Sequence, residues 1–481
     1  MSTPPPAPAP IDAATLRGRR VVLVVAVLAS FVAFLDGSIV TVALPAIARE
    51  LGGGTAGDGG TAGAGGAGLA LQQWVVDAYL LTLGSLMLVA GSLSDTFGRV
   101  RVLRAGLVGF AVTSVLAALA PDPGLLIAAR ALQGVTAALL VPSSLALITS
   151  TFTGPAQGKA IGSWTAWTGV AFLIGPLTGG ALVDTLGWRW VFAVVVVPVV
   201  LTLVLMTRLP GDAHRGGDGA PPRVDVVGAV LAAVGLAGPV FALIEGQRVG
   251  FGTWFVVTPL VVGLAALGTF VWWERRTPAP MMPLTLFRTR AFTVGNLATV
   301  GIYAALSLGT LTIPLVVQEL AGLPATLAGL VTLPTTIVSL AFSTLFGTLA
   351  ATHGPRLFMT VGPLVTAGGF LWMLLVADPI DVWWQVVPGV VLFGFGLSVT
   401  VAPLTSTVLS QIPAGQSGIA SAVNNAISRV AGLVAVAFLG VIAGGALTVS
   451  GFHRVVIVVA VLLGVSALVS FVGLRDRGRA S

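Results

Sequence analysis

Three ionisable residues interrupt long apolar segments in the first third of the chain. Asp36, Asp77 and Arg130 each lie several residues inside a run that is rich in Ala, Leu and Val. Burying a charge in hydrocarbon is costly, so ionisable residues at such positions usually face a water-filled pathway, pair with each other or exchange protons. Two acids and one base in neighbouring apolar segments therefore indicate proton or cation chemistry inside a membrane.

The spacing predicts one shared depth for these three side chains. At 1.5 Å per residue, Asp36 lies about 24 Å along its segment, and Asp77 and Arg130 each lie about five residues inside the same side of theirs. Competition between a proton, a cationic substrate and Arg130 for one carboxylate is a workable exchange cycle. The alternatives are a permanent Asp–Arg pair that only holds helices together and, for Asp77, a place among the lipid headgroups.

Arg429 is a further candidate, close to the middle of a later apolar segment. Asn424, Asn425 and Ser428 give that segment a polar face. Two interpretations stay open for Arg429, contact with an anionic group of a substrate or hydrogen bonding to backbone carbonyl groups of broken helices. Glu245 and Glu319 lie near segment ends, where we expect them to be solvated.

The composition places these residues in an integral membrane protein. Of 481 residues, 56% are hydrophobic and 9% are charged, whereas a soluble domain carries about 25% charged residues. The formal charge of +7 is spread over many loops, which argues against a nucleic-acid partner. The chain has no cysteine and only three dispersed histidines, so we expect neither a metal site nor a cofactor.

The apolar segments predict an all-α protein with fourteen transmembrane helices, because about 20 residues span the hydrocarbon of a bilayer. The expected helices cover residues 21–43, 72–93, 102–120, 125–149, 159–183, 189–208, 225–244, 254–273, 291–317, 325–350, 356–376, 383–409, 417–446 and 454–474.

Basic residues predict the orientation, since cytoplasmic loops are enriched in Lys and Arg. With the N-terminus inside, about 18 basic residues lie on the cytoplasmic side, against Arg49, Arg189, Arg248 and Arg454 outside. Both termini are therefore expected in the cytoplasm, with a disordered segment at 1–20 and no cleavable signal peptide. Arginine far outnumbers lysine, which is typical of a bacterium with a high-GC genome.

Two pairs of segments indicate an internal repeat. GSLSDTFGR (91–99) returns in weaker form as GTLAATHGPR (347–356), and residues 134–158 resemble 396–418 with Pro142 opposite Pro403. Related halves in a transporter suggest two bundles around a central site. The expected organisation is a terminus at 1–20, a six-helix bundle at 21–208, a linker at 209–224, two inserted helices at 225–273, a linker at 274–290, a second six-helix bundle at 291–474 and a tail at 475–481.

Six short segments carry a family resemblance. They are LDGSIVTVALP (35–45), WVVDAY (74–79), GSLSDTFGR (91–99), RALQG (130–134), GPLTGG (175–180) and GWRWVF (187–192). In this order and on these helices they resemble the signatures of the Major Facilitator Superfamily, specifically its fourteen-helix drug:proton antiporter group. The chain departs from the pattern at Thr41, where many relatives carry Asn, at VVP (196–198), and at Ala351, which stands opposite Asp95 in the repeat.

The resemblance implies roles for two groups of residues. In the family, the charge cluster in the loop after the second helix latches the outward-open state; the matching residues here are Gly91, Asp95, Gly98, Arg99 and Arg101. The fifth-helix motif accompanies export and is generally missing from importers; the matching residues here are Gly175, Pro176, Gly179 and Gly180.

These observations predict a proton-coupled exporter, not an enzyme, for amphipathic drugs or antibiotics, with organic cations as one candidate class. The proton and substrate residues are expected among Asp36, Asp77, Arg130 and Arg429. The expected partners are a small amphipathic substrate, protons and membrane lipids, around a monomer in the cell membrane. A dedicated exporter of a natural product made by the same cell stays open, and a symporter or an intramembrane enzyme is less favoured because GPLTGG is intact and no Asp/His/metal constellation is visible.

Overall fold

The computed structural model describes residues 13–52, 63–152, 154–209, 225–278, 280, 282–409, 412 and 417–474. These residues form α-helices, short 3-10 and π turns, and no strands. Long apolar helices are expected because a chain in hydrocarbon must satisfy its backbone hydrogen bonds internally. The prediction of an all-helical, multi-span membrane protein is confirmed.

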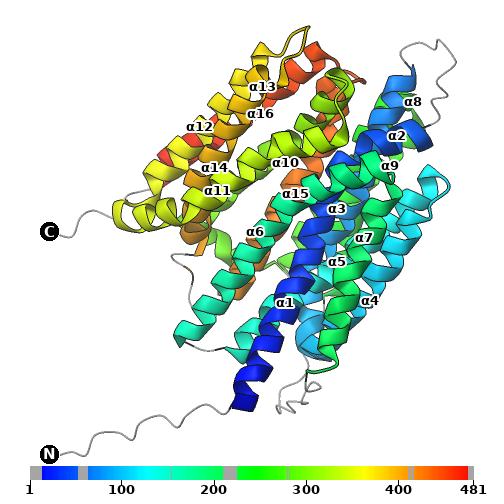
Figure 1. The fold of residues 1–481 in the computed structure, drawn as a ribbon. Helices are drawn as coiled ribbons and strands as arrows, with labels where there is room; N and C mark the ends of the chain where they lie inside the picture. The colour runs from blue at the N-terminus through cyan, green and yellow to red at the C-terminus, as the bar shows by residue number, and fades with distance from the viewer. Residues whose placement is uncertain are drawn as a thin grey trace, which may run out of the picture.

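Along the chain, two units of six long helices are separated by a two-helix hairpin, and Figure 1 shows the two units side by side. The first unit comprises α1 (Ala13–Ile39), α3 (Gly63–Phe97), α4 (Arg99–Ala118), α5 (Pro123–Thr151), α6 (Gly154–Thr185) and α7 (Arg189–Met206), with the short α2 (Leu44–Leu51) after α1. The hairpin is α8 (Val226–Val249) and α9 (Trp254–Glu274). The second unit comprises α10 (Arg290–Leu315), α11 (Ala325–His353), α12 (Pro355–Trp372), α14 (Val387–Leu409), α15 (Ser417–Ala443) and α16 (Val449–Gly473), with the short α13 (Val382–Gln385) before α14.

Thirteen helical segments of the described residues are long and apolar enough to cross a membrane, by length and composition. Each overlaps one of the expected segments. The remaining expected segment, 72–93, lies within α3, which is 35 residues long and carries some side chains outside the described residues. A count of fourteen spans is consistent with this arrangement.

The chain ends of the expected organisation are only partly described. Helix α1 begins at Ala13, so residues 13–20 are helical, although the sequence predicts disorder there. Residues 1–12, the linker residues 210–224 and the tail at 475–481 lie outside the described residues. We call the side of the bundle at which α1 begins and α16 ends the terminal face, and the other side the opposite face.

The internal repeat predicted from the sequence is visible in the backbone. Gly98, between α3 and α4, has φ +95°, and Gly354, between α11 and α12, has φ +87°. Pro142 and Pro403 also lie inside equivalent helices, α5 and α14. A positive φ is costly for any residue with a side chain, so the same glycine is required at the same turn of both units.

The repeat also governs how the two units meet. Helix α3, the second of its unit, packs against α15, the fifth of the other; α6, the fifth, packs against α11, the second. We call these two contact regions the α3–α15 seam and the α6–α11 seam. The repeat that relates the two units also relates these two seams to each other. The hairpin packs α9 on α8, and α8 in turn contacts both α3 and α15, so it lies beside one seam only.

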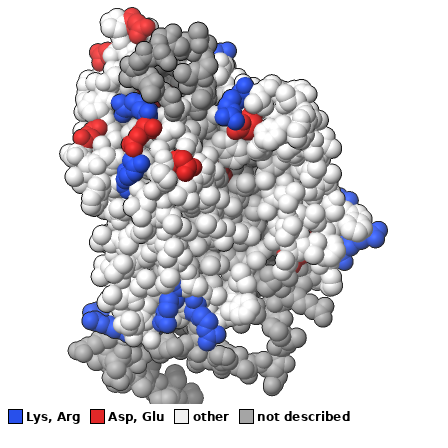
Figure 2. Space-filling model, turned by 90° about the vertical axis from the view of Figure 1, so that its right-hand side faces the viewer, with Lys and Arg blue, Asp and Glu red and all other residues white. Residues whose placement is uncertain are grey.

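On one outer face of the molecule, most exposed charged side chains lie towards the edges. Figure 2 shows a broad uncharged area on one face, with blue and red residues gathered at its top, its bottom and its right edge. Many large apolar side chains on α7, α9 and α16 are exposed, among them Val197, Val261 and Leu468. A surface of this kind is suited to lipid contact, which agrees with the membrane location.

We expect the substitution Gly354→Ala to lower the free energy of unfolding by about 1–3 kcal/mol, because φ +87° with ψ +152° lies in a region that is essentially restricted to glycine. Thermal unfolding of the detergent-solubilised protein measures the change. The control is Gly368→Ala, inside α12, where an added Cβ meets nothing within 4 Å and where alanine favours the helix. Equal unfolding midpoints for the two variants contradict the prediction.

Candidate functional site

A buried ion pair joins α1 to α5. Arg130 Nη1 lies 2.7 Å from Asp36 Oδ2, and the two side chains are 2% and 0% exposed. This contact places Asp36 and Arg130 at one depth, as the spacing predicts for these two residues. A buried pair is stable only when its remaining polar atoms also find partners, so the surroundings of the pair decide what it can do.

Those partners come from two further side chains and one backbone group. Gln133 Nε2 donates to Asp36 Oδ1 at 2.9 Å and lies 2.9 Å from Ser114 Oγ on α4, while Arg130 Nη1 donates to Gln133 Oε1 at 2.7 Å. Arg130 Nε donates to the carbonyl oxygen of Val75 on α3 at 3.0 Å. The cluster therefore connects α1, α3, α4 and α5, and both charged groups are held by more than each other.

Aromatic rings cover the guanidinium group. Its central carbon lies 4.4 Å from the centre of the Tyr79 ring and 5.8 Å from that of Phe192. Rings at these distances attract a cation through their negative faces. Tyr79 in turn donates from its hydroxyl group to the carbonyl oxygen of Ala33 at 3.3 Å. The rings and the hydrogen bonds together hold Arg130 in one position.

Gln133 and Ser114 are the hydrogen-bonding residues of this cluster that sequence reasoning missed, and only Gln133 had a signal in the sequence. Gln133 stands in the RALQG segment, three positions after Arg130, and residues three apart lie on the same face of a helix. That spacing was the available signal, since a glutamine beside a buried arginine can bridge it to a carboxylate.

Asp77 is not part of the ion-pair cluster. Its side chain is fully buried, and both carboxylate oxygens lack a hydrogen-bond partner among the described residues. One turn earlier, Gln73 donates to the carbonyl oxygens of Val436 and Ala437 on α15. Because residues four apart share a helix face, Asp77 lies on the side of α3 that faces α15, at the seam between the two units.

Arg429 lies on α15 beside the same seam. An added Cβ at Gly84 of α3 would lie 3.5 Å from the Cβ of Arg429. Its guanidinium carbon lies 5.5 Å from the centre of the Phe34 ring on α1. Asp77 and Gly84 are seven residues apart, which is about 10 Å along a helix. Arg429 is therefore placed two helical turns from Asp77 and reaches towards α1.

The GPLTGG segment on α6 is a packing surface with two sides. A Cβ added at Gly175 would lie 2.0 Å from Ser38 Oγ, and one added at Gly179 would lie 2.8 Å from the carbonyl oxygen of Ile39. Ser38 and Ile39 are at the end of α1. At Gly180 an added Cβ would lie 2.5 Å from the carbonyl oxygen of Ala325 on α11. Small residues allow such close backbone approach in membrane proteins.

Pro176 lies inside α6 next to this surface. Its carbonyl oxygen would be 2.3 Å from a Cβ added at Gly329 of α11. The α6–α11 seam is therefore closely packed by glycines from both units, and the same segment of α6 contacts α1 within its own unit.

The loop cluster after α3 is described in part. Gly98 carries the positive φ of the turn, Gly91 lies in the last two turns of α3 with open space around it, and Arg101 Nη1 donates to the carbonyl oxygen of Phe97 at 3.4 Å. The side chain of Asp95 lies outside the described residues. The latch assigned to Asp95, Arg99 and Arg101 stays a prediction.

Hydrogen bonds between the two units lie near the opposite face. Gln72 Nε2 donates to Glu319 Oε1 at 2.6 Å, and Gln318 donates to the carbonyl oxygen of Val42 at 3.1 Å. Asp184, at the end of α6, accepts hydrogen bonds from the backbone of Ala325 and Thr326 at the start of α11. The opposite face is closed in this structure by direct contacts between the units.

The hairpin is tied to the same region. Glu245 on α8 is buried, and its Oε1 accepts a 3.0 Å hydrogen bond from Trp74 Nε1 on α3. The expectation that Glu245 is solvated is wrong, because α8, which carries it, packs against α3 and α15. Glu319 is exposed as expected, although it also accepts the hydrogen bond from Gln72.

The GWRWVF segment has a structural role at the opposite face. Trp188 Nε1 donates to Glu50 Oε2 at 2.7 Å, and Arg189 forms an ion pair with the same carboxylate. The hydrogen bond from Arg189 holds the pKa of Glu50 below its ordinary value. Helix α2 is thereby attached to the start of α7.

Comparison with known sequences places this geometry in context. The profile of the Major Facilitator Superfamily matches residues 26–436. The chain is 33% identical to the puromycin resistance protein pur8 of Streptomyces alboniger, over 91% of this chain and 85% of that protein. It is 34% identical to the multidrug efflux pump LfrA of Mycolicibacterium smegmatis (85% and 77%) and 32% identical to the tetracenomycin C resistance and export protein of Streptomyces glaucescens (89% and 77%).

Solved structures agree on the fold. A crystal structure of a D-xylose-proton symporter superposes with a TM-score of 0.68 at 16% identity, covering 95% of this chain and 98% of that one. An inward-open structure of the xylose transporter XylE from E. coli gives a TM-score of 0.65 at 15% identity, covering 96% and 98%. At this identity the similarity concerns the arrangement of the helices alone.

We expect Asp36→Asn or Arg130→Gln to destabilise the protein by about 3–5 kcal/mol, because each leaves one buried charge without its partner. The double variant is expected to be more stable than either single variant, since no charge is then stranded. Thermal unfolding in one detergent, analysed as a double-mutant cycle, measures the coupling. Strictly additive effects of the two substitutions would show that the pair does not contribute as a unit.

Proposed function

Since the chain belongs to the Major Facilitator Superfamily, we propose that it exports amphipathic drugs or antibiotics, including organic cations, in exchange for protons. Relatives that share about a third of the sequence over most of both chains are a puromycin resistance protein, a multidrug efflux pump and a tetracenomycin C export protein. The observation that carries the proposal is the buried carboxylate of Asp77, which has no hydrogen-bond partner among the described residues and faces the seam between the units.

Asp77 is the group that exchanges the proton. An unpaired carboxylate is costly to bury as an anion, so in this closed arrangement the side chain carries the proton. Opening of the α3–α15 seam admits water and a cationic substrate, and the proton then leaves. Arg429, two turns away on α15, is a candidate to repel a cation or to pair with the ionised carboxylate once the helices move.

Asp36 and Arg130 have a different part in the cycle. Their pair is closed by Gln133, Ser114 and the Val75 carbonyl group, so neither charge is available to a substrate in this arrangement. The pair fixes α1, α3 and α5 relative to one another, and it holds Asp77 at a constant place on the seam. Asp36 is then a positioning residue, and its loss acts on the carrier through the geometry of α3.

Transport proceeds by alternating access between the two six-helix units. The terminal face is cytoplasmic, because the loops and ends on that side carry most of the basic residues. With this orientation, the external side is closed in the structure. The closing contacts are the Gln72–Glu319 hydrogen bond, the hydrogen bonds of Asp184 and the close packing of the α6 glycines. The latch residues Gly91, Asp95, Gly98, Arg99 and Arg101 stabilise the other state, in which the cytoplasmic side is closed.

The protein is a monomer of two six-helix bundles, residues 21–208 and 291–474, with the hairpin at 225–273 inserted between them. It resides in the cytoplasmic membrane of a bacterium, with both termini in the cytoplasm. The relatives from Streptomyces and Mycolicibacterium support the bacterial assignment and the high-GC composition.

A second function is a dedicated exporter of one natural product made by the same cell. It is favoured by one observation, that two of the relatives carry the names of single antibiotics, puromycin and tetracenomycin C. The two functions use the same site and cycle, and they differ in the range of compounds that drive proton movement.

Asp77→Asn is expected to abolish substrate-driven proton movement, because an amide cannot release the proton, and Asp77→Glu is expected to retain part of it. The assay is collapse of an imposed pH gradient in proteoliposomes on addition of ethidium, and then of neutral antibiotics. The control is Asp122→Asn, at the N-cap of α5, where asparagine caps equally well. Proton movement that survives in Asp77→Asn but is lost in a folded Asp36→Asn variant moves the carrier to Asp36.

Gly180→Leu is expected to keep the external side open, because even a Cβ at this position lies 2.5 Å from the Ala325 carbonyl oxygen. The chain has no cysteine, so spin labels at Leu186→Cys and Trp383→Cys report the distance between the two units directly. The distance distribution should shift to longer values in Gly180→Leu and stay unchanged in the control Gly368→Leu. An unchanged distribution in Gly180→Leu would show that α6 and α11 do not form the external closure.

A further inference from the structure

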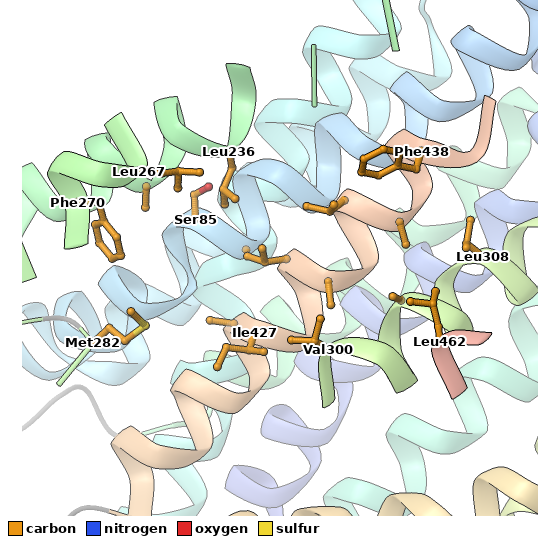
Figure 3. A pocket seen from close by; sticks show the side chains of 18 of the residues that line it. Ser85, Leu236, Leu267, Phe270, Met282, Val300, Leu308, Ile427, Phe438 and Leu462 are labelled. Atoms are coloured by element: carbon orange, nitrogen blue, oxygen red, sulfur yellow. The ribbon is translucent and has the colours of Figure 1, made fainter. Parts of the chain in front are cut away.

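An apolar cavity of about 720 Å³ lies beside the α3–α15 seam. Its walls come from α3, α8, α9, α10, α15 and α16, and Ser85 is the one polar side chain among the described residues that line it. In Figure 3, Phe270 and Met282 lie at one end and Phe438 at the other, with Ile427 and Val300 between them. Its volume falls within the range of about 300–1,000 Å³ that is usual for sites enclosing a ligand.

This cavity adjoins the candidate proton and substrate site but does not include its charged residues. Asp77 and Arg429 lie on α3 and α15, which form part of its wall, yet neither they nor Asp36 and Arg130 are among the described residues that line it. The hairpin helices and α16, which flank the units, supply Leu236, Leu267 and Leu462. Val300 and Phe438 are also among the exposed apolar side chains. The cavity therefore opens towards the lipid.

The cavity is long and narrow along α15. Residues from Ala426 to Ile442 of this helix line it, which corresponds to about 24 Å at 1.5 Å per residue. The hydrocarbon of one leaflet is about half of the 30 Å bilayer core. The cavity is therefore longer than one leaflet, so it can hold an extended acyl chain over the chain's full length, whereas a compact drug would leave much of it unfilled.

A second cavity of about 670 Å³, with both polar and apolar walls, adjoins the end that holds Met282. The neighbours of Phe270 and Met282 in the chain, Val271 and Pro283, line this second cavity together with Arg275 and Arg288. Both arginines are exposed at the terminal face. Glu274 also lines it, but its Oε2 accepts a 3.0 Å hydrogen bond from the backbone of Met282.

From this juxtaposition we propose that the hairpin forms a binding site for an anionic phospholipid of the leaflet at the terminal face. One acyl chain occupies the apolar cavity between the hairpin and α10, α15 and α16. The phosphate lies between Arg275 and Arg288, because basic residues at a membrane surface attract anionic lipid headgroups. Arg276 stacks 4.8 Å from the Trp272 ring, an aromatic residue at headgroup level.

The lipid would fill a space between the hairpin and the second unit that protein side chains leave open. The hairpin touches α15 through α8, and the lipid extends that contact along the length of α15. Lipid retention is measured without proton exchange, so it can be tested whether or not the proposed transport function is correct.

Native mass spectrometry of the full-length protein tests the proposal. The probes are phosphatidylglycerol and phosphatidylcholine with identical acyl chains, added to the delipidated protein in detergent. We expect retention of phosphatidylglycerol, at least about fivefold weaker retention in Arg275→Gln/Arg288→Gln, and loss of retention in Val300→Trp, which fills the cavity. Arg104→Gln, an exposed arginine of α4 outside both cavities, is the matched control and should retain the lipid fully.

Two results would overturn the proposal. Equal retention of the two lipids by the unaltered protein would show that Arg275 and Arg288 do not select the anionic headgroup. Full retention by a folded Val300→Trp variant would show that the acyl chain does not occupy this cavity. Ala304→Leu is a second, smaller change in the cavity wall for the case that Val300→Trp does not fold. Glycerol phosphate, which has the anionic group but no acyl chain, should not compete; competition at the same concentration would indicate a simple anion site and contradict the proposal.

Discussion

The buried pair of Asp36 and Arg130 constrains the arrangement of the first unit more than any other contact. Two charges in hydrocarbon have few stable arrangements, and this one needs α1, α3, α4 and α5 at fixed positions to supply every polar partner. Rotation of any of these helices would leave a donor or an acceptor without a partner. The position of the rest of the site follows from this arrangement, because α3 also carries Asp77 and α1 also packs against the glycines of α6.

The two seams between the units differ in chemistry although the repeat relates them. At the α6–α11 seam, Gly180 and Gly329 bring backbone against backbone, so small changes of packing decide whether the seam is open or closed. At the α3–α15 seam, Gln73 bonds to carbonyl groups, and Asp77 lies one turn beyond it without a partner. One seam is therefore suited to a steric closure and the other to an electrostatic response. Such a division is consistent with a single proton site in a protein with two related halves.

Much of the fold could be predicted because the signals were local. Apolar length gives the helices, and the rise per residue gives the common depth at which Asp36 and Arg130 meet. The turn glycines Gly98 and Gly354 follow from the repeat. The rotation of each helix about its own axis is not fixed by depth, so the sequence did not show that Asp77 faces α15 instead of Arg130. Nor could it show that Glu245 is buried, since that depends on where the hairpin packs.

The attachment of the hairpin has a mechanical consequence. Helix α8 is bonded to α3 through Glu245 and Trp74, and it meets α15 where Gln247 lies so close to Gly440 that a Cβ there would clash. Helices α3 and α15 belong to different units, so α8 bridges the α3–α15 seam. Any rotation of one unit against the other must therefore shift α15 relative to α8 or bend α8. The contacts of α8 thereby limit the relative movement of the two units on this side. The axis of their rotation is then displaced from the centre of the molecule towards the hairpin.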